Sequence, residues 1–163
     1  MIEFETLYQR HAATVFRFAL SLSGNRALAE DITSETFVRV WTARARVDVS
    51  TVTGYLLTIA RHLHMQGVSR ERRSGPFAHE PEDLAPGPHA LAAGKAELDA
   101  VLADLQTLPE PDRAALLMRA EDQMPYEDIA AALKITVGAA KVKVHRARLA
   151  LAALRMERGR LPS

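Results

Sequence analysis

The sequence predicts an all-α protein with two small helical domains, joined by a proline-rich linker, and a helix-turn-helix in the C-terminal domain. Apolar residues recur at helical spacing on both sides of residues 74–93, without strand-like alternation of useful length. Four of the eight prolines fall within residues 74–93, and a helix does not continue through proline at that density. The hydrophobic content of 48%, with only 6% aromatic residues, suits helices that pack through alanine, leucine and valine. We therefore assign residues 1–73 and 94–163 to the two domains.

The composition excludes several classes of protein. The 163 residues include no cysteine, so neither a disulfide framework nor a thiolate metal site can form. No apolar run approaches the roughly 20 residues that a membrane-spanning helix requires. The first ten residues, MIEFETLYQR, are charged and lack the apolar core of a signal peptide. The sequence therefore predicts a cytoplasmic protein with no membrane insertion.

Charge is distributed unevenly along the chain, although the formal net charge is only +1. Residues 134–163 contain eight bases against one acid, a net charge of +7. Residues 76–110 contain seven acids against one base, a net charge of −6. This polarity indicates a polyanionic partner for the basic end and at least one other contact surface, with a merely solvated basic helix as the alternative.

Three helices are expected in the N-terminal half, each with one apolar stripe. The stripe of the first helix, which ends near residues 24–25, is Phe4, Leu7, His11, Val15 and Phe18. The buried stripe of the second helix is Ala29, Ile32, Thr36, Phe37, Val40 and Trp41. A neighbouring face of this second helix carries Asp31, Ser34, Glu35 and Val38. The third helix spans residues 52–73, and its buried stripe is Leu56, Ile59, Ala60 and Leu63.

In the C-terminal half, Pro109 and Pro111 end one helix and start the next. The residues expected to be buried around this break are Leu98, Val101, Leu102, Leu105, Ala114, Leu117 and Met118. A short helix then begins near Pro125, whose missing N–H is tolerated in a first turn. It ends at Leu133, and Thr136 is placed to cap the longer helix that follows with its hydroxyl group.

The last two helices and the short turn between them form a helix-turn-helix pattern. On the second helix of the pattern, the residues that face inward are Ala140, Val144, Ala147 and Leu151. The side chains on this helix that are left free to contact a partner are Lys141, Lys143, His145, Arg146 and Arg148. The first residues of such a helix can enter a major groove, while the flanking bases neutralise phosphates. Helical hairpins in ordinary bundles share the pattern, and the basic outer face is what favours DNA binding here.

Three separate motifs resemble bacterial sigma factors of RNA polymerase. The run LQTLPEPDRAALLMRAEDQMPYEDIAAALKITVGAAKVKVHRARLAL resembles their C-terminal domain. The run AEDITSETFVRVW resembles their core-polymerase-binding helix, and YLLTIARHLHMQGVSRERR is similar to their minus-10 helix. The motifs follow the family's order, and nothing remains for the extra domains of housekeeping sigma factors. The chain is therefore identified as a member of the two-domain extracytoplasmic-function group of the sigma-70 family.

The resemblance implies an alternative sigma factor, which binds RNA polymerase core and directs it to promoter DNA in the bacterial cytoplasm. The β′ clamp of the polymerase would contact Asp31, Ser34, Glu35, Val38 and Trp41. The unpaired minus-10 strand would contact Asp48, Ser50, Thr51, His62, Gln66, Arg70 and Arg73. The minus-35 duplex would contact Thr136, Ala139, Lys141, Lys143, His145 and Arg146. The β flap of the polymerase and an anti-sigma factor are further implied partners, and the linker would pass through the RNA exit channel.

Several departures from the family pattern bear on these roles. Ser34 stands where the family usually has a glutamine, which weakens one polar contact to the clamp. His62 and Gln66 stand where the minus-10 helix usually has asparagine and aspartate, so the preferred base there cannot be copied from the family. Lys134 replaces the turn glycine, at a cost of roughly 1 kcal/mol if the turn is left-handed. Ala139 replaces a threonine and can offer DNA only an apolar contact, such as with a thymine methyl.

Some of these residues also have ordinary structural interpretations. Phe37 and Trp41 are expected in the core, where they would support the contacting face. Asp31 and Glu35 are expected to be exposed and would otherwise form a solvated helix face. The proline-rich linker predicts domains that move independently in the free protein, which an anti-sigma factor would lock together.

Other functions fit the sequence less well. No nucleophile, base and orienting group recur together, and there is no glycine-rich phosphate loop, so neither catalysis nor a cofactor is expected. His62 and His64 point about 200° apart on a helix, which argues against a zinc site. Two alternatives stay open: a stand-alone helix-turn-helix regulator, and a helical protein-interaction adaptor with no salt-dependent affinity for DNA. The motifs in residues 29–73 argue against the first alternative.

Overall fold

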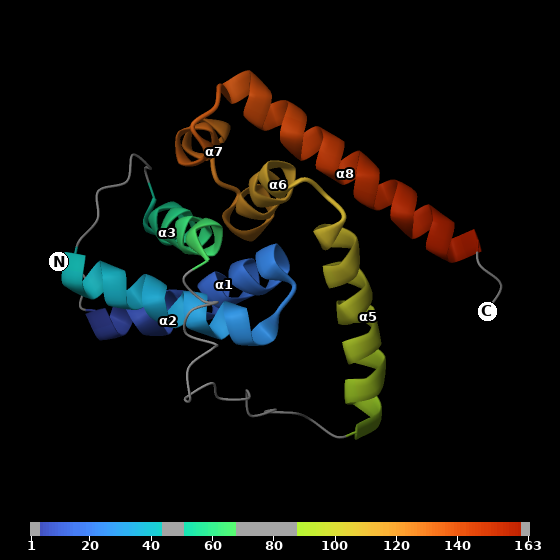
Figure 1. Ribbon diagram of the computed structural model, residues 1–163, viewed down its shortest axis with the longest axis horizontal. Coiled ribbons are helices and arrows are strands. Elements are labelled where there is room, and N and C mark those ends of the chain that lie inside the picture. The colour runs from blue at the N-terminus through green and yellow to red at the C-terminus, as the bar shows by residue number, and fades with distance from the viewer. Residues whose placement is uncertain (1–3, 44–50, 68–87, 161–163) are drawn as a thin grey trace.

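The computed structural model describes residues 4–43, 51–67 and 88–160, whose arrangement is shown in Figure 1. This part of the chain is all-α, as the sequence predicts. Its helices are α1 (Phe4–Ser23), α2 (Arg26–Ala43), α3 (Val52–Gln66), α5 (Pro88–Gln106), α6 (Glu110–Asp122), α7 (Tyr126–Leu133) and α8 (Val137–Arg160). None of the helices in these ranges combines the length and the apolar character needed to cross a membrane.

The first three helices pack against one another around a shared apolar core. Side chains that are at most 2% exposed include Val15, Phe18, Leu22, Ala29, Ile32, Phe37, Leu56, Leu57 and Leu63. Between α1 and α2, Gly24 has a left-handed backbone (φ 68°), and Asn25 Oδ1 accepts a 3.0 Å hydrogen bond from the Leu28 N–H. The predicted end of the first helix near residues 24–25 is confirmed.

The third helix is shorter than predicted. It begins after its N-cap, Thr51, but it ends at Gln66 rather than at residue 73. Gly67 follows with a left-handed backbone (φ 69°), and its N–H donates to the His64 carbonyl. A glycine in this conformation ends a helix because it satisfies a terminal carbonyl without a Cβ clash. Residues 68–87, which include most of the predicted linker, lie outside the described residues.

The helix α5 begins earlier than predicted, so residues 88–93 of the expected linker are helical. Its first residue is Pro88, and a proline is compatible with a helix start because no N–H is needed there. The N-terminal part of α5 extends away from the other helices in Figure 1. Leu98 and Val101 are therefore 45% and 51% exposed, whereas both were expected in the core. Leu102 and Leu105, further along α5, are buried as predicted.

In the C-terminal half, α8 packs on α6 and α7 and also contacts α5. The side chains of Ala140, Val144 and Ala147 are at most 1% exposed and face this contact, as predicted, while Leu151 is partly buried. The expected core positions Ala114, Leu117 and Met118 of α6 are also buried. The small side chains of α8 let it lie close to α6 and leave its opposite face exposed.

The two halves contact each other mainly through α6, which lies against both α1 and α3. Arg61 of α3 donates two hydrogen bonds to Glu110 of α6, from Nη2 to Oε1 (2.6 Å) and from Nε to Oε2 (3.0 Å). These side chains are 17% and 18% exposed. Arg17 Nε of α1 also lies 3.4 Å from Glu121 Oε2 of α6. Independent motion of the two domains would require these contacts to break.

Candidate polymerase and nucleic-acid interfaces

The turn between α7 and α8 has the geometry that the sequence predicts. Lys134 has a left-handed backbone (φ 59°, ψ 47°), and its N–H donates to the Ala131 carbonyl at 3.3 Å. Thr136 Oγ1 accepts a 3.1 Å hydrogen bond from the Ala139 N–H and so caps α8. The predicted capping role of the Thr136 hydroxyl is therefore confirmed.

The face of α8 opposite its buried residues is exposed. Side chains on this face or at its edges include Lys141, Val142, His145, Arg146, Arg148 and Leu149. Val142, which is 53% exposed, was not among the predicted contact residues. The sequence carried a signal for it, because Val142 lies two residues from both Ala140 and Val144. A step of two residues turns a side chain by about 200° on a helix, so burial of its neighbours directs Val142 outward.

Two of the predicted DNA-contacting bases are bound to a carboxylate of α6. Asp112 Oδ1 lies 3.2 Å from Arg146 Nη2 and 3.6 Å from Lys143 Nζ. The Asp112 side chain is only 7% exposed, and that of Lys143 is 21% exposed. The expectation that α8 leaves both bases free is therefore wrong. Residues three apart on a helix are neighbours, and this spacing allows one carboxylate to contact both.

Lys141 lies on the other edge of α8, beside an aromatic ring of α7. Its Nζ is 5.7 Å from the centroid of the Tyr126 ring, and the Arg119 guanidinium carbon is 4.7 Å from the same centroid. Arg119 also donates a 2.8 Å hydrogen bond to the Met124 carbonyl, which ties the end of α6 to the start of α7. Tyr126 is thus a fixed neighbour for Lys141 near the N-terminal end of α8.

The predicted polymerase-binding face of α2 ends in exposed apolar side chains. Val38 and Trp41 are 46% and 66% exposed, and Ser34 is exposed as well. The expectation that Trp41 belongs to the buried stripe is wrong, because it lies near the end of α2, where Phe4 contacts its ring edge-on at 4.9 Å without enclosing it. Phe37, one turn earlier, is 2% exposed and belongs to the core as expected.

The acidic residues of α2 are less exposed than predicted. Asp31 and Glu35 are both partly buried. The Glu35 side chain is 16% exposed, and its Oε1 lies 3.8 Å from Arg39 Nε. Reversing the charge of Glu35 would therefore disturb local packing as well as any contact with a partner. Ser34, Val38 and Trp41 are the residues of the predicted set that α2 presents most openly.

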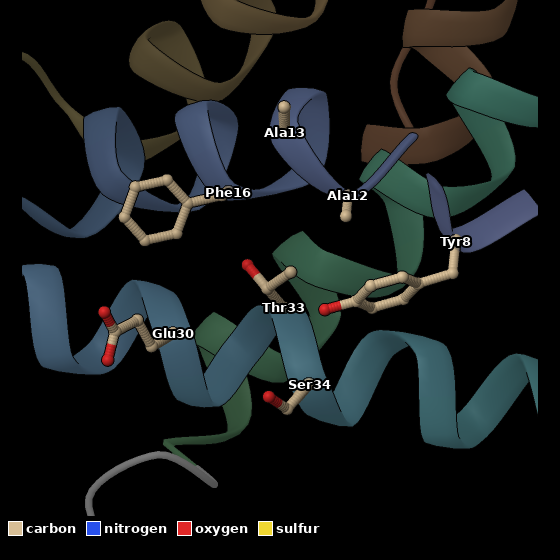
Figure 2. A pocket seen from close by; sticks show the side chains of 7 residues that line it. All are labelled: Tyr8, Ala12, Ala13, Phe16, Glu30, Thr33 and Ser34. Atoms are coloured by element: carbon tan, nitrogen blue, oxygen red, sulfur yellow. The ribbon is translucent and has the colours of Figure 1, made fainter. Parts of the chain in front are cut away.

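A pocket lies beside this face, between α1 and α2 (Figure 2). It has a volume of about 460 Å³ and is lined by Tyr8, Ala12, Ala13, Phe16, Glu30, Thr33 and Ser34. The rings of Tyr8 and Phe16 lie toward its two ends, and Glu30 lies near the Phe16 end. Ser34 joins the pocket to the exposed face of α2. The described residues include no group of three or more histidines and acids that could hold a metal ion.

The described part of the predicted minus-10 site lies on α3. His62 and Gln66 are exposed and four residues apart, so they share one face of the helix. Gln66 Oε1 accepts a 3.5 Å hydrogen bond from Arg39 Nη2 of α2. Thr51 is the N-cap of α3, and its Oγ1 accepts a 3.0 Å hydrogen bond from the Gly54 N–H. Outside the described residues lie Asp48, Ser50, Arg70 and Arg73.

Both halves of the chain match known protein families. Residues 7–74 match the family described as sigma-70 region 2, and residues 98–151 match the family described as sigma-70, region 4. The chain belongs to the sigma-70 family of RNA polymerase sigma factors. Sigma factors direct promoter-specific transcription initiation by RNA polymerase and are not enzymes, so both of these predictions are confirmed.

Relatives place this sigma factor in the extracytoplasmic-function group. It is 33% identical to the ECF sigma factor SigE of Mycolicibacterium smegmatis, over 91% of its own length and 60% of that relative. It is 31% identical to CarQ of Myxococcus xanthus, over 88% and 83% of the two chains. It is 35% identical to the ECF sigma factor EcfG of Rhodopseudomonas palustris, over 84% and 76%. The chain thus spans less than two thirds of SigE and most of the other two.

Two solved structures resemble the fold of this sigma factor along most of its length. The sigma factor RpoE from Bartonella quintana, in complex with the anti-sigma factor NepR, has a TM-score of 0.70 and 26% identity, covering 94% of this chain and 96% of RpoE. CnrH, in complex with the cytosolic domain of CnrY, has a TM-score of 0.69 and 24% identity, covering 94% and 88%. The CnrH likeness concerns the fold alone.

Proposed function

We propose that this sigma factor binds the polymerase clamp with α2, holds the opened minus-10 strand on α3 and reads the minus-35 duplex with α8. The observation that carries this assignment is that the exposed faces of the three helices differ in chemistry. The exposed face of α2 carries Val38 and Trp41 beside Ser34, and that of α3 carries His62 and Gln66 beside Met65. The exposed face of α8 is basic around Val142. These properties suit a protein surface, unpaired bases and a DNA duplex, respectively.

On α2, the contact with the clamp would centre on Val38 and Trp41, with Ser34 beside them. Interface centres are depleted in charge and enriched in aromatic residues, which dominate the binding energy when they become desolvated. Asp31 and Glu35 would form the polar rim. The pocket between α1 and α2 is continuous with this face through Ser34, and it would accept an apolar side chain of the polymerase.

On α3, His62 and Gln66 would contact unpaired bases of the minus-10 element. An imidazole ring can stack on a base, and an amide can both donate and accept hydrogen bonds at a base edge. Gln66 would exchange its 3.5 Å hydrogen bond with Arg39 for such a contact. From the family resemblance we include the following residues in this site: Asp48, Ser50, Thr51, Arg70 and Arg73.

On α8, Lys141, Val142 and His145 would lie toward base edges in the major groove. Lysine is suited to the acceptors of guanine, and an isopropyl group is suited to the methyl of thymine. Arg148, one turn beyond His145, would contact phosphate. Ala139 would add a small apolar contact at the start of the helix, which the Thr136 cap holds in place.

We also propose that an anti-sigma factor controls this protein in the bacterial cytoplasm. Support comes from RpoE of Bartonella quintana, which shares the fold and 26% identity and is known in complex with the anti-sigma factor NepR. The proline-rich segment between the two halves would enter the RNA exit channel when the polymerase is bound, and the C-terminal half would contact the β flap.

The test is run-off transcription with a heterologous bacterial core polymerase and fragmented genomic DNA, followed by mapping of the start sites. We expect the chain to direct initiation at discrete sites that share sequences near minus-10 and minus-35, which core alone does not use. Initiation no greater than with core alone, combined with salt-dependent DNA binding by the chain, would instead indicate a stand-alone helix-turn-helix regulator.

A further inference from the structure

The bases of α8 fall on two edges of the helix that differ in their partners. Lys141, Arg148 and Arg155 recur at intervals of seven residues and form what we call the open edge. Lys143 and Arg146, three residues apart, form the held edge. Within the described ranges, ion pairs involve both bases of the held edge and none of the open edge.

The held edge is bound by one buried carboxylate. The same atom, Asp112 Oδ1, contacts Arg146 Nη2 at 3.2 Å and Lys143 Nζ at 3.6 Å. Asp112 is 5% exposed, and it lies in the first turn of α6, where the helix dipole favours negative charge. A buried carboxylate is costly without a nearby opposite charge, so Asp112 keeps at least one of the two bases beside it.

We propose that Asp112 is a positioning residue that limits how many bases of α8 reach the DNA backbone and thereby sharpens sequence discrimination. This inference rests on the proposed minus-35 role of α8. A base that stays on Asp112 neutralises no phosphate and releases no counterion from the DNA. Since such contacts supply nearly all of the affinity for unrelated sequences, Asp112 weakens non-specific binding and leaves sequence reading to residues such as Lys141 and Val142.

The size of the effect follows from counterion release. Each base that contacts phosphate adds about 0.9 to the steepness of log affinity against log salt concentration. A fourfold change in salt therefore changes affinity about three- to fourfold for each such base. Replacing Asp112 by the neutral and nearly isosteric asparagine would release Lys143 and Arg146 toward DNA, steepening the slope by about one to two.

The experiment uses the full chain and two duplexes: one selected by the wild-type chain from a random pool, and a scrambled version of it. Affinities are measured at several salt concentrations. We expect Asp112→Asn to bind the scrambled duplex several-fold tighter at low salt, with the steeper slope, and to discriminate less between the two duplexes. An unchanged slope with an intact helical spectrum would overturn the proposal and leave Asp112 a purely structural residue.

Asp104→Asn is the matched control. Asp104 is also buried, at 8% exposure, and its Oδ1 lies 2.5 Å from Nη2 of Arg158 at the far end of α8. Loss of its charge should affect stability much as loss of the Asp112 charge does, but it should leave the salt slope unchanged. A slope increase equal to that of Asp112→Asn would show a general charge effect and would contradict a specific role for Asp112.

A second set of variants tests the inference without altering Asp112, in case Asp112→Asn does not fold. Lys143→Gln and Arg146→Gln should each flatten the slope by less than half as much as Arg148→Gln, which removes a proposed phosphate contact. Equal flattening by all three would overturn the inference. If the wild-type chain selects no duplex and binds DNA without salt dependence, the proposed DNA binding by α8 is wrong. If the wild-type chain discriminates between the duplexes but the variants do not behave as expected, only the role of Asp112 is wrong.

Discussion

The two halves of the molecule present exposed faces of opposite character, although each face belongs to a helix packed on the other helices of its half. In the N-terminal half, α2 shows the uncharged side chains Val38 and Trp41. In the C-terminal half, α8 shows Lys141 and Arg148 on either side of Val142 along the helix. The first face suits a protein partner and the second a polyanion. Both nevertheless have an apolar residue at the centre, which shows that an apolar side chain at helical spacing need not belong to the core.

The largest expected effect is on the affinity for polymerase core, when the exposed apolar side chains of α2 are replaced. The double substitution Val38→Asp and Trp41→Ala should weaken binding to polymerase core by about 100-fold or more, because buried aromatic anchors carry most of an interface's energy. DNA affinity and the midpoint of denaturant unfolding should change little, since both side chains are exposed. Titration of labelled core with the full chain measures the first quantity.

Met156→Ala is the control for that substitution, since Met156 is 61% exposed on α8 and lies outside the proposed clamp contact. It should leave core binding at the wild-type level. If the double variant binds core as tightly as this control does, the clamp contact must be assigned to another surface.

Substitutions on α8 should change DNA affinity and leave the affinity for polymerase core unchanged. Lys141→Ala should cost about 1–3 kcal/mol on the selected duplex and relax preference at one base, because a lysine near the helix start can contact guanine. Arg148→Ala should weaken binding to every duplex alike and flatten the salt slope by about one. Neither change should alter core binding. Equal losses on matched and scrambled duplexes for both variants would make α8 an electrostatic anchor only.

The ion pair between the two halves should contribute a smaller free energy, measured as its coupling energy in the stability of the chain. A double-mutant cycle on Arg61 and Glu110, whose side chains are less than one fifth exposed, should give a coupling energy of about 1 kcal/mol or more. The exposed pair Arg26 and Glu30 offers a control, with an expected coupling below about 0.5 kcal/mol. Chemical denaturation of the single and double alanine variants measures both energies.

Small-angle scattering connects this ion pair to the motion of the halves. We expect Arg61→Ala to increase the radius of gyration of the free chain, because the two halves would separate more often. Unchanged dimensions would mean that apolar packing of α6 on α1, rather than the Arg61 ion pair, holds the halves together.

The smallest effect concerns the C-terminal half alone. Lys134→Gly should stabilise the chain by about 0.5–1 kcal/mol, because glycine adopts the left-handed backbone observed at this position without a Cβ clash. Lys134→Ala keeps the Cβ atom and should give no such gain. A lower unfolding midpoint for the glycine variant than for the alanine variant would contradict the strain at this turn.

The sequence was sufficient to predict the helices wherever a local chemical signal marks them. Helical periodicity located the core residues of α1, α3 and α8, and Thr136 identified the start of α8 through its capping hydroxyl. The end of α3 was missed, although Gly67 was visible, because a single glycine within a helical pattern does not always end it. The left-handed backbone of Gly67 in the structure shows that α3 ends there.

Exposure at helix ends and ion pairs between helices were harder to predict. Periodicity shows the side of a helix on which Trp41 or Val101 lies, but it does not show how far the neighbouring helix extends to cover that side. The pairing of Asp112 with Arg146 joins residues 34 positions apart, and only the packing of α6 on α8 brings them together. Surface charges on a helical wheel therefore do not reveal which bases are available to DNA.

Lys134 also places a cation at the end of α8 that would approach DNA first. Association between oppositely charged molecules is accelerated by such charges, and the acceleration fades as ionic strength rises. If α8 binds the promoter as proposed, the lysine in this turn would exchange some conformational stability for a faster encounter with DNA. In stopped-flow experiments, the more stable Lys134→Gly chain should associate with DNA more slowly at low salt and dissociate at the wild-type rate.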